Sequence, residues 1–165
     1  MDVLTVMLGP YPMGIWFVLA ALLVGGGVFT IFGQALSLLS WDTALRLGLQ
    51  EDSKQSPDPV ERTIGAMSQG EALADVIVQG IIIVLAFAGI LLKHPAGFVA
   101  GIAQSVIWLY VTFMVLSQRW MLYRWGVVKD MARLKHVTLP MVLFAGIPSV
   151  LMILCLVANK GFFSW

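Results

Sequence analysis

One carboxylate, Asp75, lies within an otherwise apolar stretch of the chain and is the first candidate for chemistry. Glu71, Asp75 and Gln79 follow at intervals of four residues, so on a helix they share one face. A carboxylate in hydrocarbon is costly unless it is paired, protonated or hydrated, which makes it a functional candidate by default. We expect Asp75 either to bind a ligand or a proton, or to form a structural ion pair with Arg119 or Arg124.

Three further polar residues could complete a site around this carboxylate. Gln34 is expected at a similar depth on the first apolar segment, and Asp42 and Arg119 at the same membrane face. Together they predict a polar pocket that opens toward the cytoplasm. Simpler alternatives are hydrogen bonds between helices for the glutamines and a capping role for Glu71, because Ser-Gln-Gly-Glu at 68–71 has the pattern of a capping box.

A basic segment with aromatic side chains between its cations lies at 118–136. The cations that could contact lipid headgroups or a partner are Arg124, Lys129, Arg133 and Lys135. Clusters of basic residues beside a membrane bind anionic lipids, and basic loops also fix the orientation of a membrane protein. The segment is therefore either a contact for lipids or a partner, or a determinant of topology.

The sequence predicts no metal site, no catalytic residue set and no bound cofactor. The single cysteine, Cys155, lies in an apolar run, and no group of Cys, His and carboxylates has the spacing of a zinc site. His94 and His136 are expected at opposite faces of the membrane, which argues against a haem with two His ligands. Nucleotide-binding, nucleophile-elbow and zinc-protease motifs are absent from the sequence.

The composition predicts an all-α, polytopic integral membrane protein. Hydrophobic residues make up 59% of the 165 residues and charged residues 12%, and the mean hydropathy is +0.91. Soluble domains contain about 25% charged residues, and a soluble core of this length could not cover so much apolar surface. The net charge of +1 and the lack of a basic stripe among exposed aromatics argue against nucleic-acid binding.

Four apolar segments are long enough to cross a bilayer, for which a helix needs about 20 residues. We expect one membrane domain at 1–165, folded as a four-helix bundle with two cytoplasmic loops. The spans are placed at about 13–39, 72–92, 96–117 and 137–157, and the loops at about 40–71 and 118–136.

The connections between the spans contain helix-start signals. The sequence Asp-Pro-Val-Glu at 58–61 predicts a helix start with Asp as N-cap and Pro in the first turn. Val60, Ile64 and Met67 would then share a face, which predicts one short interfacial helix in the first loop. Lys-His-Pro at 93–95 predicts a tight turn that makes the second and third spans antiparallel neighbours.

The distribution of basic residues predicts the orientation of the chain. Eight of the ten Lys and Arg residues lie in the two longer loops. Cytoplasmic loops are enriched in Lys and Arg, so both loops are expected in the cytoplasm and both termini outside it.

Trp-Asp at 41–42, Leu-Gly-Leu-Gln at 47–50 and Gly-Glu-Ala-Leu-Ala-Asp at 70–75 resemble short motifs in small uncharacterised bacterial four-span membrane proteins. The resemblance covers this stretch and the general helix layout. It implies that Asp42 and Asp75 belong to one site and that the protein resides in a bacterial inner membrane. It supplies no substrate, because these proteins lack an assigned activity.

The function expected from these features is that of a non-catalytic integral membrane subunit or accessory protein. Such a protein packs against lipids, other membrane proteins or a second copy of itself, which fits the few polar groups in the spans and the small loops. One alternative is a small proton-coupled transporter that uses Asp75. Another is a membrane enzyme for a lipophilic substrate, with Asp42, Glu71 or Asp75 as acid or base.

Overall fold

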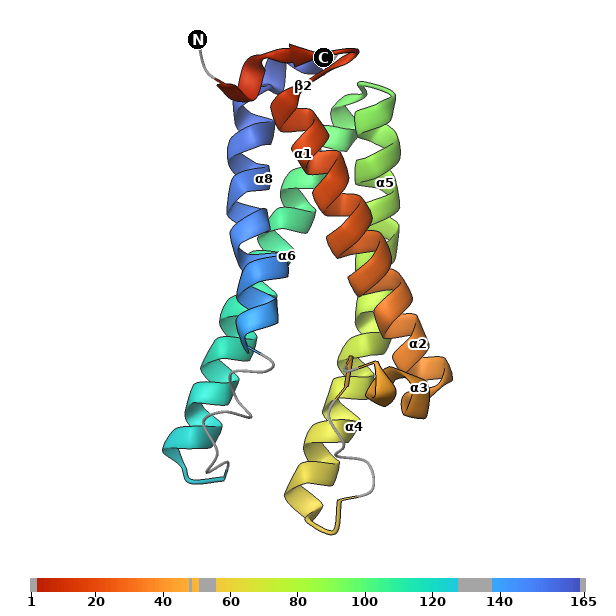
Figure 1. Ribbon diagram of the computed structural model, residues 1–165, viewed down its shortest axis with the longest axis vertical. Helices are drawn as coiled ribbons and strands as arrows, with labels where there is room; N and C mark the ends of the chain where they lie inside the picture. The colour runs from red at the N-terminus through yellow and green to blue at the C-terminus, as the bar shows by residue number, and fades with distance from the viewer. Residues whose placement is uncertain (1–2, 48, 51–55, 128–137, 164–165) are drawn as a thin grey trace. The chain divides into compact units, whose positions relative to one another are not determined.

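The computed structural model describes residues 3–47, 49–50, 56–127 and 138–163. The protein is mostly helical, at 85%, and four helices of the described part are long and apolar enough to cross a membrane (Figure 1). The first to fourth of these helices run over Met13–Leu39, Pro59–Leu91, Pro95–Arg124 and Thr138–Ala158. The prediction of a helical protein with four such segments is confirmed, although the second and third helices extend beyond the predicted spans.

Each of the long helices except the third contains a π-helical segment, in which the turns are wider than in an α-helix. The elements in chain order are η1 (Val3–Thr5), β1 (Met7–Leu8), β2 (Tyr11–Pro12), α1 (Met13–Ala21), η2 (Leu22–Gly33), α2 (Gln34–Leu39), α3 (Trp41–Arg46), α4 (Pro59–Ala74), η3 (Asp75–Gln79), α5 (Gly80–Leu91), α6 (Pro95–Arg124), η4 (Val142–Gly146), α8 (Ile147–Ala158) and η5 (Lys160–Phe162). The segments η2, η3 and η4 are the π-helical ones, and η1 and η5 are short 3₁₀ turns.

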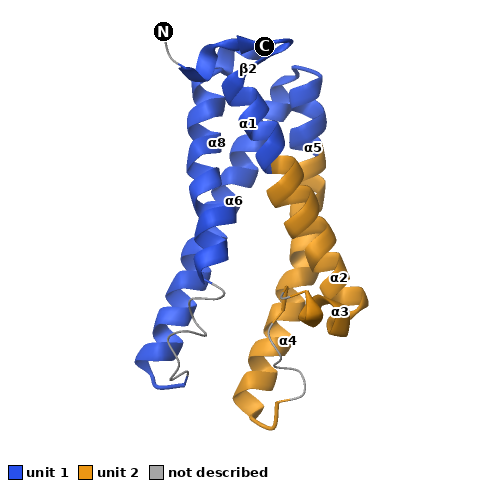
Figure 2. Ribbon diagram, in the orientation of Figure 1, with its two compact units in different colours: residues 1–21, 85–165 blue, residues 22–84 orange. Residues whose placement is uncertain are grey.

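The chain divides into two compact units, which Figure 2 shows in different colours. Unit 1 comprises Met1–Ala21 and Leu85–Trp165, and unit 2 comprises Leu22–Val84. The first and second helices therefore each contribute one part to each unit. A single membrane domain over 1–165 stays a prediction.

Unit 1 is built around α8, which packs against both α1 and α6. Its core includes the fully buried side chains of Ile15, Val18 and Leu156. The N-terminal strands β1 and β2 form a small antiparallel hairpin. The amide of Asn159 donates a hydrogen bond of 3.1 Å to the carbonyl of Leu4, so the two ends of the described chain are joined at one end of this unit.

The turn between α5 and α6 has the geometry that its sequence predicts. Lys93 adopts a left-handed conformation (φ 54°), and the N–H of His94 donates to the carbonyl of Gly89 at 2.8 Å. This is the bonding pattern with which helices commonly end. His94 then caps α6, because its Nδ1 accepts from the N–H of Ala96 at 3.1 Å, and Pro95 occupies the first turn.

The start of the second helix also follows its sequence signal. Asp58 is the N-cap, and its Oδ1 accepts from the N–H of Val60 at 2.9 Å. The helix then continues without a break into η3, so the expectation of a separate interfacial helix with a second start at 68–71 is wrong. Gly65 and Ala72 are buried within this continuous helix, and α4 packs against α2. The short helix that this loop does contain is α3.

The third helix ends later than the predicted span. It continues to Arg124, and Gly126 (φ 71°) follows in the left-handed conformation. The N–H of Val127 donates to the carbonyl of Leu122 at 3.0 Å, which closes the helix end. The loop predicted at 118–136 is therefore helical in its first part, and residues 128–137 lie outside the described residues.

Candidate functional site

Asp75 begins η3, at the centre of the second helix. Its carboxylate is partly buried and accepts a hydrogen bond from the amide of Gln79, with 2.5 Å between Nε2 and Oδ1. Gln79 itself is buried, with 4% of its surface exposed. The two side chains share a face, as their spacing predicts, and the amide orients the carboxylate.

The backbone around Asp75 is π-helical. The N–H of Gly80 donates to the carbonyl of Asp75, five residues earlier, whereas an α-helix pairs residues four apart. Single π-helical turns within α-helices are found frequently at functional sites. In the second helix this turn coincides with the acidic side chain of the apolar stretch, which makes it the strongest candidate site in unit 2.

The helix that faces η3 within unit 2 is η2, continued by α2. A Cβ added to Gly26 would lie 2.8 Å from Cγ2 of Ile83. A Cβ added to Gly80 would lie 3.9 Å from Cγ1 of Ile31. Gly26 is thus close to Ile83, and Ile31 is close to Gly80. Moving five residues forward along the first helix corresponds to moving three residues backward along the second, so the two helices are antiparallel. Continued by the same steps, this register places Gln34 level with about residue 78, so a shared depth of Gln34 and Asp75 stays a prediction.

More polar groups follow on the next turns of unit 2. The hydroxyl of Ser37 is buried, donates to the carbonyl of Gly33 at 2.9 Å and accepts from the amide of Gln50 at 3.1 Å. Trp41 is also buried, and its indole N–H has no hydrogen-bond partner within the described ranges. We use the name unit 2 polar cluster for the residues Gln34, Ser37, Gln50, Asp75 and Gln79.

Three other predicted site residues lie elsewhere. Glu71 is exposed in the middle of the second helix, so its predicted capping role is wrong, because the helix begins about three turns earlier at Pro59. Asp42 is exposed on α3, and Arg119 is partly buried on α6 in unit 1. A site that Asp42 and Arg119 share with Asp75 stays a prediction.

The basic segment is described only at its start. Arg124 is exposed in the last turn of α6. Trp120 and Tyr123 precede it, and their ring centroids are 6.4 Å apart. The other cations predicted to contact lipid or a partner lie outside the described residues: Lys129, Arg133 and Lys135.

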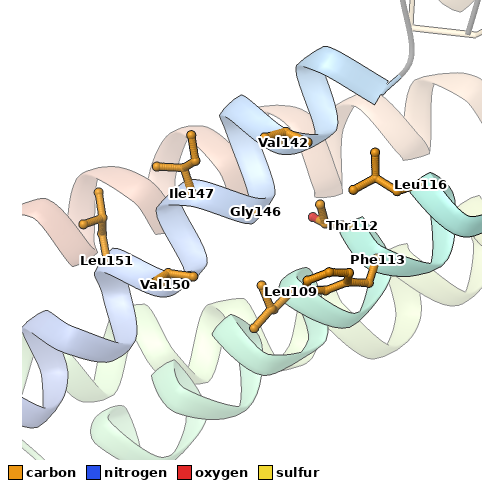
Figure 3. Close-up of a pocket in the computed structure, with 9 residues that line it drawn as sticks. All are labelled: Leu109, Thr112, Phe113, Leu116, Val142, Gly146, Ile147, Val150 and Leu151. Carbon is orange, nitrogen blue, oxygen red and sulfur yellow. The ribbon is translucent and has the colours of Figure 1, made fainter. Parts of the chain in front are cut away.

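Unit 1 contains a groove between α6 and the fourth helix, which the sequence did not predict (Figure 3). Its volume is about 360 Å³. The wall residues are Leu109, Thr112, Phe113 and Leu116 on α6, and Val142, Gly146, Ile147, Val150 and Leu151 on the fourth helix. The one hydroxyl among them, that of Thr112, donates to the carbonyl of Trp108 at 2.8 Å. A Cβ on Gly146 would lie 3.0 Å from Cγ2 of Thr112, so a glycine is needed for this approach of the helices.

No group of three or more His, Cys, Asp or Glu side chains in the described ranges could hold a metal ion. His94 acts as a helix cap, and His136 lies outside the described residues. The expectations of no metal site and of no haem with two His ligands therefore stay predictions.

Comparison of the chain with protein-family models, curated proteins and solved structures finds no match. The resemblance of its motifs to those of small bacterial four-span proteins stays a prediction.

Proposed function

We propose that the protein is a non-catalytic integral membrane subunit or accessory protein that packs against lipids and partner membrane proteins. The observation that carries this proposal is the exposure of its apolar helices. In the apolar windows of the four helices, between 28% and 33% of the residues are buried within the protein. Apolar surface left in water costs about 25 cal/mol per Å², so lipid or partner helices must cover the remainder.

The lengths of the helices fit this environment. They contain 27, 33, 30 and 21 residues, which corresponds to about 40, 50, 45 and 31 Å at 1.5 Å per residue. The hydrocarbon core of a bilayer is about 30 Å thick. Asp75 lies 16 residues, or about 24 Å, from Leu91 at the far end of its helix. When Leu91 lies at one interface of the bilayer, Asp75 therefore lies about one helical turn inside the hydrocarbon from the other interface.

The buried hydroxyls support packing over nucleophilic chemistry. Ser105, Thr112 and Ser149 are each buried. Their hydroxyls donate to the carbonyls of their own helices, at 2.7, 2.8 and 2.7 Å. Such bonds satisfy a hydroxyl inside an apolar helix, so these side chains serve the contact between helices.

The finer parts of the proposal follow from the sequence. The four helices form a bundle, both longer loops face the cytoplasm, and both termini lie outside it, in a bacterial inner membrane. A reporter that is active only in the cytoplasm, fused to the C-terminus, should give no signal. A strong signal from that fusion would reverse the orientation.

The main test concerns partners. The protein is purified from its membrane in a mild detergent and analysed by native mass spectrometry. We expect it to require the detergent and to carry a stoichiometric protein partner or a second copy of itself. A species that stays monomeric without any partner contradicts the accessory role, and one that stays dispersed in plain buffer contradicts the membrane location.

A second candidate function is a small proton-coupled transporter, which the placement of Asp75 in a π-helical turn beside Gln79 favours. Such a carrier must protonate Asp75 during its cycle. A hydrophobic carbodiimide, which reacts with protonated carboxyls in apolar surroundings, should label Asp75 in membranes. Asp42, an exposed carboxylate of the same unit, is the matched control. Labelling is compared between the Asp75→Asn and Asp42→Asn variants. Labelling that survives Asp75→Asn, or none in the original chain, removes this candidate.

A further inference from the structure

The N-terminal hairpin presents apolar side chains on its first strand. Val3, which lies just before this strand, and Met7 and Leu8 on β1 are exposed over 63%, 60% and 57% of their surfaces. Pro12 on the second strand is buried. No charged side chain occurs at 3–41, so neither the hairpin nor the helix that follows it contains a charge that would hold it in water.

Hydrogen bonds fix this hairpin against the rest of unit 1. The indole N–H of Trp16 on α1 donates to the carbonyl of Leu8 at 2.8 Å. The hydroxyl of Tyr11 donates to the carbonyl of Leu91, at the end of α5, at 3.1 Å. A third bond, from the C-terminal segment, is that of Asn159. These bonds hold the hairpin with the side chains of β1 outward, so cover for them must come from outside the chain.

The surroundings of the hairpin have the composition of a membrane interface. The rings of Tyr11 and Trp16 meet edge to face, with centroids 5.2 Å apart. The ammonium of Lys93 lies 5.8 Å from the ring centroid of Tyr11 and 5.2 Å from that of Phe162. Tyr and Trp gather where hydrocarbon meets headgroups, and lysines there direct their charge toward water. This end of unit 1, where α1 begins (Figure 1), therefore fits the boundary between the two phases.

The exposure of β1 on both faces favours lipid over a protein partner. Successive residues of a strand point to opposite faces, and Met7 and Leu8 are both apolar and exposed. A helix or strand packed on one face would leave the other side chain uncovered, whereas lipid can surround both. Full burial in hydrocarbon would leave backbone groups of β1 without water, and the headgroup layer avoids this cost.

We propose that the N-terminal hairpin is an interfacial anchor, with β1 in the headgroup layer and the side chains of Met7 and Leu8 in contact with acyl chains. The inference rests on the proposed membrane location, and it adds a contact surface and a depth. The anchor continues the apolar surface of α1, because the exposed ring of Trp16 is bonded to the strand. The start of the first span is thereby held at the interface.

Nitroxide labels at Met7→Cys and Leu8→Cys measure this depth in the full chain, reconstituted into dioleoyl phosphatidylcholine vesicles. Cys155 is buried, and the original chain treated with the same reagent gives the background. Power saturation compares collisions of the label with oxygen, which concentrates in hydrocarbon, and with a water-soluble nickel complex. Val106→Cys, at an exposed valine of α6, is the hydrocarbon reference, and Arg62→Cys, at an exposed arginine of α4, is the water reference.

The ratio of oxygen to nickel collisions at both hairpin sites should be several times that at Arg62→Cys and lower than that at Val106→Cys. A ratio as low as that of Arg62→Cys at either hairpin site overturns the inference. So does spin–spin broadening at Leu8→Cys that disappears on dilution with unlabelled chain, because a second copy would then cover the strand. The membrane location fails separately, when Val106→Cys itself gives the ratio of a site in water.

A further pair of variants tests how β1 is held. Trp16→Phe keeps an aromatic ring and removes the N–H that bonds to Leu8, so the nitroxide at Leu8→Cys should become more mobile. Trp120→Phe changes an exposed tryptophan of α6 and is the matched control, in which the spectrum should stay the same. Equal mobility in the two variants contradicts the fixed position of β1 and overturns the anchor.

Discussion

A single methyl group added to Gly97 should open the junction between the second and third helices. A Cβ built there would lie 2.9 Å from Cα of Gly89, and closer still to the Gly89 carbonyl carbon and the Ile90 nitrogen. These are backbone atoms, so no side-chain rotation can relieve the overlap. Carbon atoms in contact prefer about 3.5–4.0 Å, so Gly97→Ala must separate α5 from α6 by about 1 Å or more.

The expected loss of stability is the difference between two opposing terms. Overpacking of a close contact costs typically 1–3 kcal/mol, and the rigid backbone on both sides puts Gly97→Ala near about 3 kcal/mol. Alanine gains about 1 kcal/mol over glycine within a helix. The net loss is about 2 kcal/mol, which lowers the Tm by about 4–8 °C for a chain of this length.

Thermal unfolding of the purified protein in a mild detergent, followed by circular dichroism, measures this difference. The matched control is Gly161→Ala in the same unit, because a Cβ there would meet nothing within 4 Å. That variant should stay within about 0.5 kcal/mol of the original chain. Equal Tm values for the two variants would refute the close approach of α5 and α6 and the reasoning built on it.

Three other substitutions have expected outcomes. Gly70→Ala should raise the free energy of unfolding by about 0.5–1 kcal/mol, because Gly70 is helical with nothing within 4 Å of an added Cβ; a lower Tm contradicts this. Asn159→Ala removes the bond to Leu4 and should speed protease cleavage of the N-terminal hairpin; unchanged cleavage speaks against that tie. Ser37→Ala and Gln50→Ala should each cost about 1 kcal/mol, and the double variant little more; strictly additive losses in thermal unfolding would disprove their hydrogen bond.

The long helices and their starts were predictable because their signals are local. Hydropathy over about 20 residues identifies an apolar helix without knowledge of its neighbours. Asp58 and Pro59 supply an N-cap and a first-turn proline within two positions, and the helix begins there. His94 and Pro95 do the same for α6. The residues of one turn are therefore enough to predict where such a helix begins.

The second helix shows where local signals mislead. Ser-Gln-Gly-Glu at 68–71 satisfies the pattern of a capping box, yet these residues lie within a continuous helix. In the folded chain α4 packs against α2, a contact that the local pattern does not contain. A contact between distant segments cannot be read from a short window of the sequence. The pattern at 68–71 therefore predicts a helix start where the folded chain has a continuous helix.

The candidate site was predictable in composition and not in geometry. The spacing of Asp75 and Gln79 predicts their shared face, and the two side chains form a hydrogen bond. The π-helical turn has no recognised sequence signal, and the bond between Ser37 and Gln50 joins residues 13 apart in the chain, so neither was foreseen. Ser37 lies one turn from Gln34, so a search for polar residues along that face could have found it. The groove of unit 1 likewise depends on how α6 and the fourth helix pack against each other.

The unit 2 polar cluster also bears on whether Asp75 needs an arginine partner. A charged carboxylate at the centre of a membrane helix costs about 2.5–3.5 kcal/mol on insertion scales, and less near the interface, where the helix lengths put Asp75. A hydrogen bond to a charged group returns about 1.5–3 kcal/mol, and Gln79 provides one. Since this bond offsets most of the cost, Asp75 can remain at this depth without an ion pair to Arg119 or Arg124.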